Sequence, residues 1–307
     1  MTGSLSVPIL CPVLIGRTSQ LEALTRLIEQ ARGGAGQTAL IAGEAGIGKS
    51  RLVAELKTRA AQLGFSLLQG NCFDSDRALP YAPLLDLLRS FCANHTDAEI
   101  AAGLGGSAAE LTKLLPELAT RLPGFSPAPA LEPEAEKRRL FNALSQFFTG
   151  GTGSGHVPLL IVIEDLHWSD DTSLEFLLHL ARRILSQPVL LLLTYRIDET
   201  HPALVHFLAE LDRGRLALEL TLQGLTLAEA DGKLRAIFQL ERPLSAAFQQ
   251  TLQALTEGNP FFIEETLKAL SASGSFSSKK GAGTRSPSMS YTSRAACRRR
   301  YCAARND

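Results

Sequence analysis

The strongest structural signal in the chain is the segment Thr38-Ala-Leu-Ile-Ala42, which leads directly into Gly43-Glu-Ala-Gly-Ile-Gly-Lys49-Ser50. The first five residues are an apolar run that predicts a buried strand, and helical periodicity begins at Lys49 and runs to Leu63. The segment between them matches the pattern G-x-x-x-x-G-K-[ST]. Glycines let such a loop wrap a phosphate with backbone N–H groups, and the following helix adds its positive N-terminal dipole. The sequence therefore predicts a nucleotide site here rather than a glycine-rich turn.

Two side chains of this phosphate loop have separate roles. We expect Lys49 to reach the β- and γ-phosphates, where it serves binding and catalysis, and Ser50 to place its hydroxyl on Mg²⁺. ATP or ADP with Mg²⁺ is the predicted cofactor. The residues predicted to contact it are those of the loop and the next residue: Gly43, Glu44, Ala45, Gly46, Ile47, Gly48, Lys49, Ser50 and Arg51.

A second apolar run, Leu159-Leu-Ile-Val-Ile, ends in the acidic pair Glu164-Asp165. One carboxylate at such a position can hold the Mg²⁺ shell while its neighbour orients or deprotonates the attacking water. Glu164 and Asp165 are therefore both candidate metal ligands and catalytic residues, and their division of roles stays open. The alternative is that these acids, with Ser169–Asp171, cap the next helix.

Apolar runs alternate with helical stretches, which indicates βα units around a parallel sheet. We predict an α/β fold, a three-layer P-loop NTPase with a small helical lid after it. The predicted strands are Thr38–Ala42, Phe65–Gln69, Leu159–Ile163, Val189–Thr194 and Leu216–Leu220. The predicted helices are Ser19–Arg32, Lys49–Leu63, Ala82–Cys92, Ala108–Arg121, Glu134–Phe148, Thr172–Leu185, Pro202–Leu211, Leu227–Phe238, Ser245–Thr256 and Pro260–Ser271.

Four segments follow from this pattern. We predict a leader at residues 1–14, an ATPase core at 15–223, an incomplete helical lid at 224–271 and a disordered tail at 272–307. The glycine-rich stretch 150–155 is interpreted as a flexible connection.

The chain of 307 residues has 31 basic and 31 acidic side chains, but this neutrality is an average. The tail has eight basic residues and one acidic residue, and it contains no Leu, Ile or Val. Such a segment cannot supply a hydrophobic face. Three interpretations remain open: a nucleic-acid-binding arm, a solubilising tail, or translation in a shifted frame, which we favour.

The cysteines and the hydropathy exclude several classes of protein. The five cysteines, at positions 11, 72, 92, 297 and 302, form no Cys-x-x-Cys pair, which argues against a zinc site or a disulfide framework. No apolar run is long enough to span a membrane, and no secretory signal is recognisable. We expect a cytoplasmic protein with no membrane partner.

Five blocks of sequence together resemble one family. They are Leu14-Ile-Gly-Arg17 with Gln20-Leu-Glu22, Ala42 to Leu52, Ile163-Glu-Asp-Leu-His-Trp168-Ser-Asp170, Leu193-Thr-Tyr-Arg196, and Glu257-Gly-Asn-Pro-Phe-Phe-Ile-Glu-Glu265. In this order they resemble the AAA-type STAND ATPase domain of large LuxR-type transcriptional regulators, over residues 13–270. The chain would correspond to the N-terminal ATPase module alone.

The resemblance implies further site residues. Ile15, Gly16 and Arg17 would lie near the adenine, and Arg196 would act as a catalytic sensor of the γ-phosphate on a strand between those of the phosphate loop and the acidic pair. Pro260 would bring the helical lid against the nucleotide. For Trp168, packing beside the loop is an alternative to a chemical role.

The implied function is an ATP-binding, slowly hydrolysing switch module of a signalling or transcriptional regulator, with self-association through the ATPase domain. A non-catalytic nucleotide-binding module is one alternative. A nucleic-acid binder acting through the basic tail is another, although no helix-turn-helix supports direct DNA binding.

Overall fold

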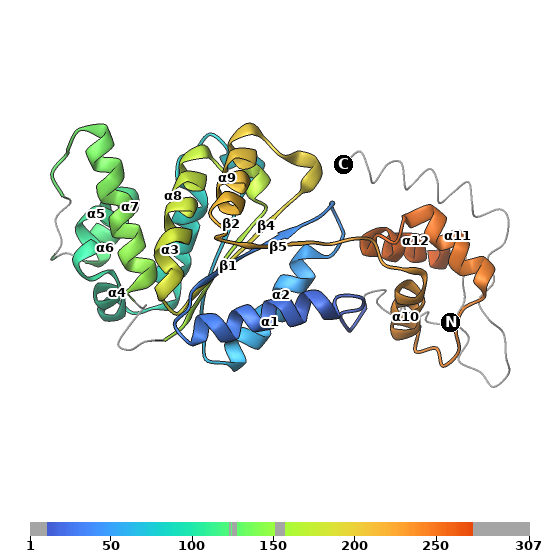
Figure 1. Ribbon diagram of the computed structural model, residues 1–307. Coiled ribbons are helices and arrows are strands. Elements are labelled where there is room, and N and C mark those ends of the chain that lie inside the picture. The colour runs from blue at the N-terminus through green and yellow to red at the C-terminus, as the bar shows by residue number, and fades with distance from the viewer. Residues whose placement is uncertain (1–10, 123, 125–127, 151–156, 273–307) are drawn as a thin grey trace, which may run out of the picture. The chain divides into compact units, whose positions relative to one another are not determined.

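The computed structural model describes residues 11–122, 124, 128–150 and 157–272, which are drawn as ribbon in Figure 1. The chain divides into two compact units. The sheet unit comprises Ser19–Gly43 and Val53–Thr221. The lid unit comprises Met1–Thr18, Glu44–Leu52 and Leu222–Asp307. The described part of the basic tail ends at Ala272, so the prediction of a disordered tail lies almost wholly outside the described residues.

The sheet unit is built on five parallel strands in the order β2-β3-β4-β1-β5. Their bounds are β1 Gln37–Ala42, β2 Ser66–Asn71, β3 Leu159–Glu164, β4 Val189–Tyr195 and β5 Leu218–Thr221. The registers place Ala42 beside Tyr195 and Ile163 beside Leu193, so β1, β3 and β4 end at the same edge. This order confirms that the strand before Arg196 lies between the strand of the phosphate loop and that of the acidic pair.

Helices cover both faces of the sheet. The side chains of Ile161, Ile163, Leu191 and Leu193 belong to the large core that includes residues of α3 (Ala82–Asn94), α8 (Asp171–Arg183) and α9 (Pro202–Arg213). Figure 1 shows α1 (Thr18–Arg32) and α2 (Lys49–Gln62) on the opposite side. Strands β3 and β4 are apolar and buried along their length, as expected for central parallel strands with both faces covered. The structure confirms the three-layer α/β fold.

A helical insertion connects β2 to β3, and it differs from the prediction at two points. The predicted helix Ala108–Arg121 is wrong as a single element, because it divides into α5 (Ala108–Leu114) and α6 (Leu118–Arg121). Pro116 lacks an N–H and disfavours helical backbone at Leu115, whose φ and ψ are −127° and 84°. Helix α4 (Asp97–Leu104), which begins at a capping box, was not predicted.

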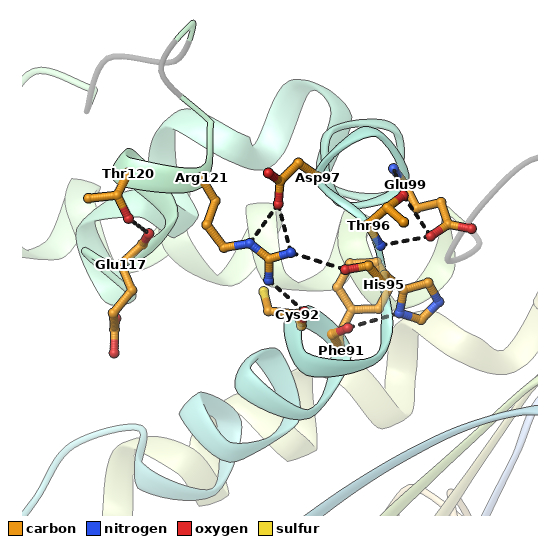
Figure 2. A network of polar contacts seen from close by, with 9 residues as sticks. All are labelled: Phe91, Cys92, His95, Thr96, Asp97, Glu99, Glu117, Thr120 and Arg121. Atoms are coloured by element: carbon orange, nitrogen blue, oxygen red, sulfur yellow. Dashed lines mark hydrogen bonds and ion pairs between the residues drawn. The ribbon is translucent and has the colours of Figure 1, made fainter.

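Arg121 joins these short helices (Figure 2). Its guanidinium donates to the carbonyl oxygens of Cys92 and His95 over 2.6 and 3.1 Å, and to Asp97 Oδ1 over 2.7 Å. Two of these acceptors lie at the C-terminal end of α3, where helix carbonyls have no intrahelical partner. Arg121 therefore holds the end of α3 beside the start of α4. The last helix of the insertion is α7 (Pro133–Thr149), which begins at a proline.

The lid unit contains three helices around its own core. They are α10 (Leu227–Phe238), α11 (Ala246–Thr256) and α12 (Pro260–Ala272). The core is formed by buried apolar residues from all three helices and the preceding turn, among them Leu225, Leu234, Phe248 and Ile263. Cys11 lies in the same cluster. The N-terminal segment therefore packs with the C-terminal helices, although more than two hundred residues separate them.

The remaining element predictions are confirmed, and no end differs from its prediction by more than two residues. Five short 3₁₀ helices lie among the described residues: η1 Asp74–Asp76, η2 Gly105–Ser107, η3 Leu166–Trp168, η4 Ile184–Ser186 and η5 Ile197–Glu199. The three described cysteines, Cys11, Cys72 and Cys92, are free and buried. Burial is the main cause that raises the pKa of Cys72 to about 12.

Candidate functional site

The phosphate loop follows β1 and leads into α2, as the sequence predicts. Its backbone requires glycine at two positions, because φ is +73° at Gly46 and +103° at Gly48. Lys49 is the first residue of α2 and is buried. Its Nζ donates to Glu44 O over 3.0 Å, which places the ammonium group within the curve of the loop. A lysine held there can meet the phosphates of a nucleotide bound by the loop.

Three successive carbonyl groups of the loop accept hydrogen bonds from other parts of the lid unit. Asn259 Nδ2 donates to Ala45 O over 2.9 Å, and the backbone N–H of Phe261 donates to Gly46 O over 3.3 Å. Ile47 O accepts from Arg17 Nη2 over 3.1 Å. These three bonds fix the loop backbone through its carbonyl groups. They do not use the backbone N–H groups, which are the groups that bind phosphate in such a loop.

Arg17 is buried, and its guanidinium bonds to backbone oxygens. In addition to Ile47 O, it donates to Gln223 O over 2.7 Å and to Gly16 O over 3.3 Å. Burial lowers the pKa of Arg17, and the nearby Glu229 carboxylate opposes this change. Arg17 thus links the N-terminal segment, the phosphate loop and the chain leading into the lid helices.

The neighbours of Arg17 are closely packed as well. Gly16 has φ of +69°, and a Cβ there would lie 2.7 Å from the Glu229 carboxyl carbon. Ile15 packs against the core of the lid unit. Arg51, at the other side of the loop, donates to Pro12 O over 3.0 Å. The structure brings Ile15, Gly16 and Arg17 into the same unit as the phosphate loop, and their placement near adenine stays a prediction.

The acidic pair lies at the end of β3 in the sheet unit. Glu164 Oε1 accepts from Gln69 Nε2 over 3.2 Å, so a residue of β2 orients this carboxylate. Asp165 has a left-handed backbone, with φ of 63°, and its N–H donates to Thr194 Oγ1 over 3.1 Å. Glu164 is therefore held through its side chain and Asp165 through its backbone, and neither contact assigns the metal to one of them.

The helix-capping alternative applies to another residue. Asp170 is the N-cap of α8, and its Oδ1 accepts from the Ser173 N–H over 2.9 Å. Asp165 precedes η3 and makes no side-chain cap there. The capping role is thus filled by Asp170, and the Asp165 carboxylate is not used in this way.

Arg196 follows β4 and meets the residues after the acidic pair. Its guanidinium carbon lies 5.1 Å from the centroid of the Trp168 ring, and it forms an ion pair with Glu199. The buried His167 links both ends of this group, since its Nδ1 lies 4.0 Å from Asp165 Oδ1 and its Nε2 lies 3.6 Å from Glu199 Oε2. Trp168 packs partly against the core, as the packing interpretation predicts, and its ring also faces the Arg196 guanidinium. A chemical role for this tryptophan stays a prediction.

Pro260 begins α12, where a missing N–H costs the helix nothing. The residues on either side of it, Asn259 and Phe261, contact the phosphate loop. Asn259 was not predicted as a site residue, and neither were Thr194, which contacts Asp165, and Glu199, which pairs with Arg196. A polar residue directly before a helix-starting proline is a local signal of an N-cap, but it does not reveal a partner 214 residues away.

The residues present are compatible with a nucleotide and Mg²⁺. Among the described residues, no group of three or more His, Cys, Asp or Glu side chains is arranged to hold a metal ion by itself. Mg²⁺ at nucleotide sites is usually held by one or two protein ligands together with phosphate oxygens and water. Ser50 in the lid unit, and Glu164 and Asp165 in the sheet unit, are each residues of a kind that can bind Mg²⁺. No helix within the described ranges is long and apolar enough to cross a membrane.

Comparisons with known proteins give a family match and one longer relative. A family model described as AAA ATPase domain matches residues 13–193. An uncharacterized protein of Rhizobium meliloti (strain 1021) is 30% identical over 196 residues, which are 60% of this chain. The chain covers only 18% of that relative.

The fold is also similar to solved structures. The ORC2 protein of Aeropyrum pernix, in its ADPNP–ADP complexes, superposes with a TM-score of 0.52 and 16% identity over 95% of this chain and 69% of that chain. Its ADP form gives the same values. At this identity the likeness concerns the fold alone.

Proposed function

The chain belongs to the AAA ATPase domain family, and on that premise we propose that it is the ATP-binding, slowly hydrolysing switch module of a signalling or transcriptional regulator. The observation that carries this proposal is the phosphate loop, in which Lys49 lies within the curve of the backbone and successive carbonyls are anchored to the lid unit. A loop held in this way is ready to bind phosphate without first becoming ordered.

The proposed roles follow from the chemistry of each group. Lys49 neutralises the β- and γ-phosphates, and Ser50 contributes a hydroxyl to the Mg²⁺ shell. Mg²⁺, when bound with ATP, neutralises charge on the phosphates. Glu164 and Asp165 divide the metal shell and the orientation of water between them. Arg196, oriented by Trp168 and Glu199, reads the γ-phosphate.

The finer assignment is also a proposal. The five sequence blocks support a STAND module of the LuxR type, in which Ile15, Gly16 and Arg17 lie near adenine and Pro260 brings the lid to the nucleotide. The relative that the chain matches is several times longer, which agrees with a module that works beside sensor and output domains. ATP binding would favour self-association, and hydrolysis to ADP would reset the switch. We place this module in the cytoplasm.

Nucleotide binding and turnover by the purified chain test the proposal in two steps. Lys49→Ala should remove binding of ATP and Mg²⁺, measured by calorimetry, because the loop loses its cation. Glu164→Gln and Asp165→Asn should keep binding and reduce steady-state turnover. Wild-type affinity in Lys49→Ala would refute the site. Binding without turnover above background in the wild-type chain would instead favour the non-catalytic module.

A further inference from the structure

The turn before α12 presents one side chain to the phosphate loop. Asn259 is buried, with 4% of its surface exposed, and both ends of its carboxamide are used. Nδ2 donates to Ala45 O over 2.9 Å, while Oδ1 accepts from the Phe261 N–H over 3.1 Å. Since the backbone N–H of Phe261 can only donate, it fixes which end of the amide is oxygen. The NH₂ group must therefore face the loop.

Close packing around this amide leaves the loop little freedom. A Cβ on Gly46 would lie 3.1 Å from Asn259 Oδ1 and 2.7 Å from Phe261 Cβ. The Gly46 backbone is thus in direct contact with the turn. A shift of the loop on the scale of one methyl group would require the turn to move with it.

The turn itself is rigidly connected to the helices of the lid unit. The Asn259 N–H donates to Thr256 O over 2.8 Å, and Asn259 O accepts from the Ile263 N–H over 2.9 Å. Gly258 has φ of +76°, and a Cβ there would lie 2.2 Å from Leu225 O. Asn259 therefore lies between the end of α11 and the first turn of α12, in a closely packed and hydrogen-bonded turn.

We propose that Asn259 is a positioning residue for nucleotide binding: its amide fixes the phosphate loop through Ala45 O and makes α12 move together with the loop. This inference rests on the proposed function, since it assumes that the loop binds nucleotide. The amide bonds to a carbonyl and not to the loop N–H groups that hold phosphate, so it acts through the loop backbone. The nucleotide affinity of the loop then depends on a residue of the lid.

Substitutions at Asn259 separate this role from helix capping. Asn259→Ser keeps an oxygen that can accept from the Phe261 N–H, but it is too short to reach Ala45 O. Asn259→Asp keeps the shape and places an acceptor against the Ala45 carbonyl. Gln253→Ala is the matched control, because Gln253 Nε2 also donates to a backbone carbonyl of the lid unit, Leu225 O, over 3.2 Å.

Two measurements on the full chain test the proposal. With a fluorescent ATP analogue and Mg²⁺, Asn259→Ser should bind about tenfold more weakly, mainly through faster dissociation, and Asn259→Asp more weakly still. Without nucleotide, amide hydrogen exchange in residues 45–49 should be faster in Asn259→Ser than in Gln253→Ala. Gln253→Ala should bind within about twofold of wild type. Urea unfolding of each variant shows whether a loss of affinity comes from global destabilisation.

The outcomes distinguish this inference from the proposed function. Wild-type affinity and exchange in Asn259→Ser, with binding lost in Lys49→Ala, would overturn the inference and keep the proposed function. Wild-type affinity in Lys49→Ala would overturn the proposed function itself. Equal loss of affinity in Asn259→Ser and Gln253→Ala would show a merely structural role and also overturn the inference.

Discussion

The backbone N–H of Asp165 donates a hydrogen bond to Thr194 Oγ1, which is the last but one residue of β4. The bond joins the turn after β3 to the neighbouring strand at the sheet edge where β1 also ends. Asp165 has a left-handed backbone, which is uncommon for a residue other than glycine. The hydroxyl of Thr194 therefore supports an unusual conformation at one of the proposed catalytic acids.

Thr194→Val should lower turnover more than nucleotide affinity. Valine removes the acceptor of the Asp165 N–H, so the free energy of unfolding should fall by about 1 kcal/mol, and the aspartate should lose its fixed position. Urea unfolding and steady-state ATP hydrolysis measure the two effects. Thr194→Ser, which keeps the hydroxyl, is the control. Equal turnover in the valine and serine variants would contradict the role of this bond.

Gly46→Ala should abolish tight nucleotide binding. The new methyl group would lie 2.7 Å from Phe261 Cβ, and φ of +73° is unfavourable for alanine by about 1–2 kcal/mol. Gly34→Ala isolates the backbone effect, because Gly34 has φ of +89° and no atom within 4 Å of the added Cβ. Calorimetry should show normal binding in Gly34→Ala. If Gly46→Ala also binds normally, the loop is not packed as described.

Arg121→Lys should destabilise the helical insertion. A lysine cannot reproduce the fork that donates to Asp97 and two carbonyl groups, so we expect a loss of about 1–3 kcal/mol. Arg89→Lys is the comparison, since Arg89 forms only an exposed ion pair with Glu117 over 3.5 Å. Its effect should stay below about 1 kcal/mol. Thermal and urea unfolding of both variants test this, and similar losses would refute the special role of Arg121.

The stability of the chain should fall as the pH drops below about 6.5, the usual pKa of histidine. Burial is the main cause that lowers the pKa of His179, with further lowering by Arg183 and Arg182. As the pH falls, the unfolded chain therefore binds a proton at His179 before the folded chain does. The free energy of unfolding decreases between the unfolded pKa and the lower folded pKa of this residue. The pKa of His201 is lowered in the same direction, mainly by burial.

His179→Leu should reduce this pH dependence without removing it, because His201 still titrates. The measurement is the urea midpoint at about pH 5 and about pH 7.5, on either side of the ordinary pKa. An equal difference between the two pH values in variant and wild type would exclude His179 as a cause.

Much of the sheet unit could be predicted because its signals are local. The apolar runs Leu159–Ile163 and Val189–Thr194 are typical of buried parallel strands, and both were placed within one residue of their ends. The missed helix α4 also had a local signal, the spacing Thr96-x-x-Glu99 of a capping box. The division of Ala108–Arg121 could likewise have been read from Pro116.

The contacts that complete the candidate site had no local signal. Asn259 lies 214 positions from Ala45 and Arg17 lies 206 positions from Gln223, so their partners are set by tertiary packing. The proximity of Arg196 to the turn after β3 depends on the strand order, and that order could be predicted only through the family resemblance. The stacking on Trp168 depends on side-chain geometry that periodicity does not encode.

The lid unit is assembled from three separate segments of the chain, and this limits where the chain can be truncated or recombined. Residues 44–52 belong to the same compact unit as the chain from Leu222 onward. A fragment ending at residue 223 would retain the phosphate-loop motif, the acidic pair and Arg196, yet lose two of the three donors that hold the loop carbonyls. Exchanging the last three helices between homologues would therefore replace part of the proposed nucleotide site, so the loop and the lid helices should be exchanged together.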